Sequence, residues 1–142
     1  MKKGVDYPGV SIVFYCHDGN DRVLMAKRKD TCRDEHGCWD IGGGGLELHD
    51  GVEATLRNEI FQEYRTRVLE FEFLGYRDVH RQQGEVRTHW VALDFKVLVD
   101  ANQWGNGEPH KFDEVRWFER NEMPSPIHSQ LPEFLRLYKD RL

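Results

Sequence analysis

Cysteines and long hydrophobic segments are scarce in this sequence. Three cysteines occur among 142 residues, of which 39% are hydrophobic. An odd number of cysteines in a chain with enough apolar residues for a core does not suggest a disulfide framework, so we expect reduced thiols. The longest apolar runs, residues 10–16 and 90–93, are much shorter than the roughly 18 residues that span a bilayer. The N-terminal residues lack the apolar part of a signal peptide, and a cytoplasmic protein without a membrane span is therefore expected.

The sequence also lacks an excess of basic residues. The 20 lysines and arginines are outnumbered by 25 aspartates and glutamates, which gives a net charge of −5. General nucleic-acid binders usually carry a basic surface that displaces counterions from phosphate groups. The motifs of serine hydrolases and P-loop kinases are absent too, because no nucleophile elbow occurs and no Lys-Ser/Thr pair follows the glycines. We expect one domain over residues 1–142 that belongs to none of these classes.

Hydrophobic patterns predict a mixed α/β fold. We expect strands at residues 10–16, 22–28, 71–76, 89–99 and 115–118, the first two forming a hairpin. Apolar residues spaced by four predict a helix from about residue 51 to 64, with Asp50 and Glu53 forming a capping box at its start. A last helix begins near Pro132 and carries apolar residues up to Leu142 at helical spacing. Strands interleaved with two separated helices indicate a layered α/β architecture.

The most informative segment joins a run of four glycines, Gly42 to Gly45, to the acidic helix that follows it. Several adjacent glycines let the backbone approach a ligand or ion closely, which a merely flexible loop does not require. On the helix, Glu59 and Glu63 are four residues apart and share a face with Gln62. A solvated acidic face, partly neutralised by Arg67, is the simpler alternative.

Read as one unit, residues 39–66 resemble the motif of the Nudix hydrolase family, G-x5-E-x7-R-E-U-x-E-E-x-G-U, where U is a bulky aliphatic residue. Aligned from Gly44, the pattern places Asp50 at the first Glu, Glu59 and Ile60 at the E-U pair, and Glu63 at the second Glu of E-E. Besides Asp50, four positions depart from it: Asn58 replaces Arg, Gln62 replaces Glu, and Arg65 and Thr66 replace the final G-U. The aromatic Trp39 ahead of the glycines is also typical of the family, and the similarity extends over about residues 9–140.

The resemblance implies a Nudix-type α/β/α sandwich, with a mixed β-sheet between helices. It further implies Mg²⁺-dependent hydrolysis of a nucleoside diphosphate linked to another moiety, with Mn²⁺ as a second usable ion. The expected metal ligands are Glu59, Glu63, the carbonyls of Gly43 and Gly44, and the uncharged amide of Gln62. Glu59 and Glu63 are also the expected catalytic carboxylates, and Glu108 is the first candidate for the general base. Asp113 and Glu114 are alternatives for the base.

Candidate substrate contacts are the side chains of Arg28, Glu47, Arg77, Arg81 and His89. The last three flank a turn at residues 82–84, where we expect His80 and His89 to face each other; a solvated hairpin end is the alternative. Trp104 and Phe112 either stack on a nucleobase or pack locally.

A zinc site is a weak alternative in this sequence. Cys32, His36 and Cys38 lie close together in the sequence but lack the fourth ligand of a zinc site.

The expected partner is a small-molecule nucleotide, and a homodimer is compatible with the sequence. Because Asn58, Gln62 and Arg65 depart from the pattern, the alternative function is a catalytically weakened Nudix-fold nucleotide-binding or regulatory module.

Overall fold

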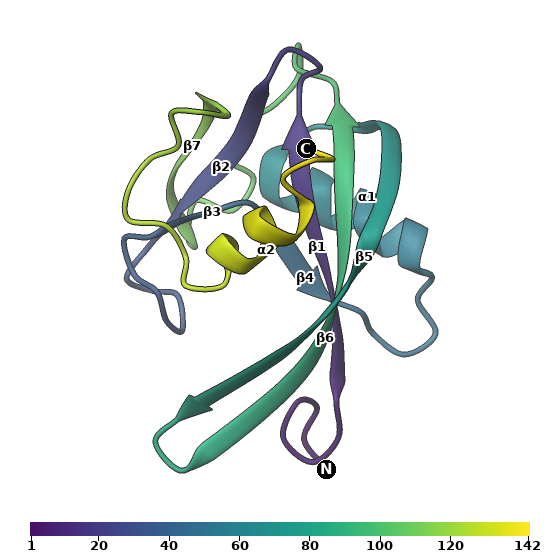
Figure 1. Cartoon of the computed structure of the whole chain (residues 1–142), viewed down its shortest axis with the longest axis vertical. Helices are drawn as coiled ribbons and strands as arrows, with labels where there is room; N and C mark the ends of the chain where they lie inside the picture. Colours follow the sequence, from purple (N-terminus) through teal and green to yellow (C-terminus); the bar gives the residue numbers. More distant parts are fainter.

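A mixed seven-stranded sheet forms the centre of the computed structural model, which describes residues 1–142 (Figure 1). The strands are β1 (Gly9–His17), β2 (Arg22–Arg28), β3 (Trp39–Asp40), β4 (Gly43–Gly45), β5 (Val68–Gln83), β6 (Val86–Val99) and β7 (Phe112–Glu119). Their order is β3-β2-β1-β6-β5, with β4 beside β1 and β7 beside β2. Only β1 and β6 run parallel; the other pairs are antiparallel.

Helices α1 (Val52–Tyr64) and α2 (Leu131–Tyr138) cover opposite faces of this sheet. Alternate residues of β1 explain why: Ile12 and Phe14 belong to the hydrophobic cluster that includes α1, whereas Tyr15 belongs to the cluster that includes α2. Successive strand side chains point to opposite faces, so a strand with apolar residues on both faces needs a layer on each side. Figure 1 shows α2 in front of the sheet and α1 behind it. The expected α/β/α layering is confirmed, and neither helix meets the length and hydropathy of a membrane span.

The first expected hairpin exists only near its turn. β1 and β2 pair at a single register position, His17 with Val23, and β2 then pairs along its length with β7. The vacated edge of β1 is taken by Gly43–Gly45, which pair with residues 11–13 and form β4. The glycine segment is therefore a short strand and not the loop that the sequence suggests.

The start of α1 differs from the sequence-based expectation. Its N-cap residue is Gly51, and no side chain caps the helix, so the predicted capping box of Asp50 and Glu53 is wrong. Glu53 instead lies 3.8 Å from Arg57 one turn along the helix. The helix ends at Arg65, whose backbone is left-handed with φ of 52° and whose amide donates to the Phe61 carbonyl. At the other end of the chain, α2 stops at Tyr138, short of the expected periodic position Leu142.

β5 and β6 are much longer than the sequence patterns predict and form an arm that extends beyond the rest of the sheet (Figure 1). Their turn is tight, because Gln83 pairs with Val86 and the intervening Gly84 has φ of 64°. His80 pairs with His89, as expected, and their rings stack with centroids 4.2 Å apart. β7 is also longer than predicted and begins at Phe112.

Candidate active site

Three carboxylates from two distant segments meet beside α1. Glu59 and Glu63 lie on the helix, and Glu108 lies in the connection between β6 and β7. This connection packs against the end of α1, because the amide of Gly107 donates to the Glu63 carbonyl at 2.9 Å. A Cβ atom on Gly107 would lie 1.9 Å from the carbonyl oxygen of Gln62, so only glycine permits this approach. The close approach places Glu108 within electrostatic reach of both helix acids.

Glu63 is the most buried of the three, with an exposed fraction of 5%. Burial, together with the neighbouring charges of Glu108 and Glu59, holds the pKa of its carboxyl well above its usual range. Burial and Glu108 also raise the pKa of Glu59. A single hydrogen bond reaches the Glu63 carboxylate, from the Gly43 amide at 3.2 Å. The site thus collects negative charge that the protein compensates only in part.

Strand β4 closes this carboxylate cluster from the side of the sheet. A Cβ atom on Gly44 would lie 2.5 Å from the carboxyl group of Glu59, and one on Gly42 would lie 3.0 Å from Oε2 of Glu63. Gly44 therefore packs directly against a carboxylate, whereas the tightest contact of a Cβ on Gly42 would be with the Phe14 ring at 2.3 Å. Neither position has a positive φ, so these glycines serve close packing and not an unusual backbone conformation. Carboxylate and carbonyl oxygens crowded together are the donor set that Mg²⁺ prefers. The residues present fit a divalent cation of this kind.

A cavity of about 350 Å³ lies next to the cluster and reaches Glu63 and the glycines of β4. Its wall carries Arg28 and Arg81, which both contact the carboxylate of Asp34, at 3.1 and 3.2 Å respectively. Although burial opposes it, the charges of Arg81, Arg33 and Arg28 lower the pKa of Asp34. An anionic ligand that enters the cavity would compete for these arginines with Asp34 and, at Arg81, also with Glu35, whose Oε2 lies 2.8 Å from the guanidinium.

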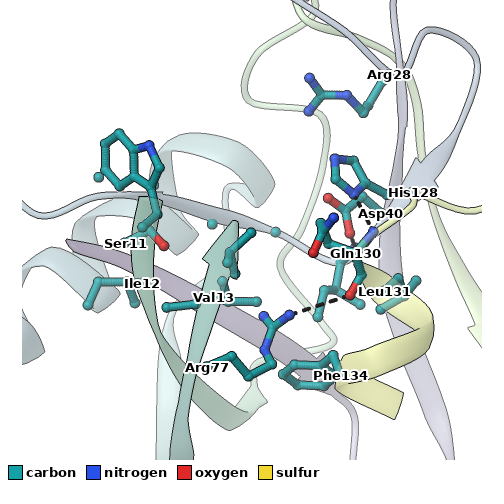
Figure 2. Close-up of a pocket in the computed structure, with 18 of the residues that line it drawn as sticks. Ser11, Ile12, Val13, Arg28, Asp40, Arg77, His128, Gln130, Leu131 and Phe134 are labelled. Carbon is teal, nitrogen blue, oxygen red and sulfur yellow. Dashed lines mark hydrogen bonds between the residues drawn. The ribbon is translucent and has the colours of Figure 1, made fainter. Parts of the chain in front are cut away.

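Arg77 also lines the cavity but is held by a buried ion pair. Its guanidinium donates two hydrogen bonds to Asp94, of 2.7 and 2.9 Å, and the Tyr138 hydroxyl donates to the same carboxylate at 2.7 Å. A third, longer bond of 3.4 Å reaches the Gln130 carbonyl, and Phe134 lies beside the guanidinium (Figure 2). Arg77 therefore ties β5, β6 and α2 together at the base of the cavity.

Comparison with known proteins identifies the family. The model of the NUDIX domain matches residues 7–138. The chain belongs to the Nudix family. This match confirms the resemblance found in the sequence, and it covers nearly the whole chain.

Individual Nudix relatives agree with this assignment. The RNA pyrophosphohydrolase of Acidiphilium cryptum (strain JF-5) is 28% identical over 133 residues, covering 84% of this chain and 80% of the relative. The MutT NUDIX hydrolase from Burkholderia pseudomallei superposes with a TM-score of 0.81 at 22% identity, covering 93% of this chain and 98% of that one. The NUDIX domain of Shewanella oneidensis NrtR, complexed with ADP ribose, gives a TM-score of 0.73 at 16% identity over 99% of this chain and 90% of that one. The two structures show a shared fold, and the family and the named relative support the enzyme class expected from the sequence, a Nudix pyrophosphohydrolase.

The structure shows how this chain accommodates its departures from the Nudix pattern. Arg65, which stands where the pattern has glycine, still adopts the left-handed conformation that favours glycine. Thr66 replaces an aliphatic residue but is buried, and its hydroxyl donates to the Asp100 carbonyl at 2.8 Å. Asn58 and Gln62 carry uncharged amides, so neither adds charge to the carboxylate cluster, and both side chains are exposed.

Lys111 is the cation nearest to the cluster, and sequence reasoning missed it. Its Nζ lies 3.3 Å from Oε2 of Glu108, and its charge opposes the rise in the pKa of Glu59 and Glu63. Lys111 thus supplies positive charge beside the acids. In the family pattern, an arginine at position 58 would carry positive charge on the same helix as Glu59 and Glu63. Only the position of Lys111 three residues after Glu108 could have drawn attention to it. The Arg67 side chain, expected to relieve Glu63, lies instead 3.5 Å from Asp100.

Several other expected site residues lie away from the cavity. His89 faces Asp78 at 2.9 Å, and the exposed Glu47 contacts Lys3 at 2.9 Å. Trp104 packs locally against Trp117, with ring centroids 6.3 Å apart. Other members of the expected set divide between the cavity and the surface: Phe112 lines the cavity, Asp113 is exposed, and Glu114 pairs with Arg116.

The cavity also contains residues that no local motif indicates. Asp40 and His128 lie next to each other in its wall (Figure 2), although 88 positions separate them in the sequence, and Trp90 comes from β6. Burial raises the pKa of Asp40, while the neighbouring His128 opposes that rise. The cysteines at 32 and 38 are free, as expected.

Proposed function

We propose that this chain is a divalent-cation-dependent Nudix hydrolase that cleaves the pyrophosphate bond of a nucleoside diphosphate linked to another moiety. The observation that carries the proposal is the buried carboxyl of Glu63, whose pKa is raised by burial and by the nearby acids Glu108 and Glu59. Three acids in one place destabilise one another unless a cation lies between them. Because Glu63 lines a cavity that also carries arginines, such a cluster is suited to a substrate rich in phosphate.

The proposed ligands of the cation are the carboxylates of Glu59 and Glu63, together with a backbone carbonyl of Gly43 or Gly44. Bound there, Mg²⁺ or Mn²⁺ would neutralise phosphate charge and lower the pKa of the attacking water. Gln62 is a weaker candidate, because its side chain is exposed and carries no charge. We therefore expect this site to hold fewer or more weakly bound ions than one built on the complete Nudix pattern.

Other side chains would serve as general base, bind the phosphate groups and contact the nucleobase. Glu108, with its side chain 15% exposed beside Lys111, accepts a proton from water as the water oxygen attacks phosphorus. The phosphoanhydride P–O bond then breaks, and the leaving phosphate carries the bonding electrons away. Arg28 and Arg81 bind the phosphate oxygens, which take the place of Asp34 and, at Arg81, also of Glu35. Trp90 and Phe112 form aromatic parts of the wall, where a nucleobase can stack.

A second candidate function is nucleotide binding with little or no turnover. The uncharged amides of Asn58 and Gln62 favour it, because these two positions of the pattern contribute no charge to the cluster. The ADP ribose complex of NrtR, a protein of the same fold, makes a nucleotide ligand reasonable for this alternative as well. A cytoplasmic location and a homodimeric state remain predictions.

The discriminating experiment measures Mg²⁺-dependent phosphate or nucleotide release from a panel of substrates. The panel contains nucleoside triphosphates, dinucleotides, ADP-ribose, nucleotide sugars and a triphosphate-ended RNA, the last chosen because of the relative's name. Turnover of at least one compound, abolished by EDTA and restored by Mg²⁺, is the expected result. Binding of a nucleotide without turnover of any compound in the panel would reject the hydrolase proposal in favour of nucleotide binding.

A further inference from the structure

Two histidines and an aspartate form a compact cluster on the β5–β6 arm. Ligand-type atoms of Asp78, His80 and His89 all lie within 4.8 Å of one another. The register explains the cluster, because His80 is paired directly with His89 across the strands and Asp78 lies two residues before His80 on the same face. We propose that this cluster, here called the arm site, binds a divalent transition-metal ion such as Zn²⁺.

The arm site lies on the opposite side of the strands from the catalytic cavity. Val79 and Arg81 on β5, and Thr88 and Trp90 on β6, line that cavity. Their neighbours in the sequence point the other way, since side chains alternate along a strand. An ion held at the arm site would therefore be separate from the one proposed at the carboxylate cluster, and the inference does not depend on the proposed hydrolase activity.

Binding an ion requires the three side chains to rotate toward one another. Zinc bonds to imidazole nitrogen and carboxylate oxygen measure about 2.0–2.2 Å, so two ligand atoms of one tetrahedral ion lie about 3.4 Å apart. The present separations of up to 4.8 Å exceed that spacing by about 1.4 Å, which rotation about the side-chain bonds can close. His89 contacts Oδ1 of Asp78 at 2.9 Å and its ring stacks on that of His80, so one ring must turn out of the stack for both to point a nitrogen at the same ion.

The surroundings leave room for the remaining ligands. The arm site borders a hollow of about 540 Å³ between the N-terminal segment 4–8 and the arm, into which water ligands would project. Asp6 and Arg87 both line this hollow, and the carboxylate of Asp6 accepts a hydrogen bond of 2.5 Å from the Lys2 amide. The segment is attached to the arm by a hydrogen bond of 2.8 Å from the His89 amide to the Gly4 carbonyl.

The donor set distinguishes the arm site from the carboxylate cluster. Imidazole nitrogen suits Zn²⁺, Ni²⁺ and Co²⁺, whereas Mg²⁺ prefers sites made entirely of oxygen atoms. Two imidazoles and one carboxylate therefore select a transition-metal ion in the presence of excess Mg²⁺. By joining β5 to β6 at their paired histidines, the ion would also stiffen the arm behind the cavity wall.

The test is a Zn²⁺ titration of the 142-residue chain in excess Mg²⁺, monitored by calorimetry and by the NMR resonances of the histidine ring nitrogens. We expect the rings of His80 and His89 to shift together as one ion binds. The variants His80→Gln and His89→Gln should each weaken this binding by at least about tenfold, the loss that removing even an outer partner of a metal ligand produces.

Two controls make the result decisive. His49→Asn removes another exposed histidine, at a position with φ of 74° that asparagine tolerates, and it should bind Zn²⁺ as the wild type does. Asp78→Asn should weaken binding while leaving thermal unfolding close to that of the wild type. Zn²⁺ binding that shifts only other histidines, or equal affinity in a folded double variant lacking both His80 and His89, would overturn the arm site.

Discussion

Glu63 is an acid placed where water cannot stabilise its charge. Its carboxyl is buried, and the acids Glu108 and Glu59 raise its pKa further. A carboxyl with a raised pKa favours its neutral form in the folded protein, whereas the unfolded chain ionises it near the ordinary value of 4.5. The cation proposed at this position would reverse that preference by stabilising the charged form.

The raised pKa of Glu63 gives a prediction for how the stability of the metal-free protein depends on pH. Because folding retains a proton that the unfolded chain has lost, the contribution of Glu63 to stability falls as the pH rises above about 4.5 toward the raised folded value. Glu63→Gln removes that loss, so in EDTA the variant should gain stability relative to wild type as the pH increases from 5 to 8. Urea unfolding at a series of pH values measures the difference. A constant difference over this range would show that Glu63 is ionised freely in the folded state.

Arg65 carries a backbone conformation that suits glycine better. Its φ of 52° ends α1 in a left-handed turn, which costs a residue with a side chain about 1–2 kcal/mol. Arg65→Gly should therefore be more stable than Arg65→Ala by about 1 kcal/mol in chemical unfolding. The comparison with alanine removes the contact of the arginine with the Phe61 ring from both variants. Equal stability of the two would mean that the helix ends differently in solution.

Strand β4 places its backbone directly against the carboxylate of Glu59. Gly44→Ala would place a Cβ atom 2.5 Å from the carboxyl of Glu59, whereas Gly45→Ala would meet no atom closer than 3.9 Å. We expect Gly44→Ala to displace Glu59 and to reduce kcat/KM by about tenfold or more, while Gly45→Ala retains wild-type activity. Steady-state kinetics with circular dichroism as a folding control measures this. Equal kinetics for the two variants would remove β4 from the site.

The buried pair of Arg77 and Asp94 joins elements that are distant in the sequence. Removing one partner of a buried ion pair typically costs about 3–5 kcal/mol, because the other charge is left without compensation. Arg77→Met should destabilise the fold by that amount, whereas Arg87→Met on the exposed arm should change it by less than about 0.5 kcal/mol. Thermal unfolding checks both. A small loss of stability in Arg77→Met would indicate that Arg77 serves mainly to bind substrate.

Elements with a clear local signal could be predicted from the sequence. The apolar spacing of α1 and the buried run of β1 gave boundaries within a few residues of those observed. The capping box failed because Asp50 lies one position before the true N-cap, Gly51. Strand β4 could not be foreseen, since three glycines have no strand propensity and pair with β1 only through close tertiary packing.

At the scale of the whole molecule, the mixed sheet assembles a site from segments that the sequence separates. The family motif locates Glu59 and Glu63, but their placement beside Lys111 depends on the packing of the segment around Gly107 against α1. The contributions of His128 and Asp94 to the cavity and its base depend likewise on long-range contacts that no local pattern records. Part of the acidic excess of the sequence is local, because Glu59, Glu63 and Glu108 gather where a cation would compensate them.

The central claim is that these acids bind the cation that makes hydrolysis possible. The most direct test compares Mg²⁺-dependent hydrolysis of the best panel substrate by wild type, Glu63→Gln and Glu53→Gln. Glu53 lies on the same helix but is exposed and paired with Arg57, so its variant controls for the loss of one helix charge. We predict that Glu63→Gln loses at least about a hundredfold in kcat, whereas Glu53→Gln stays within about twofold of wild type. Unchanged Mg²⁺-dependent turnover by folded Glu63→Gln would contradict the account.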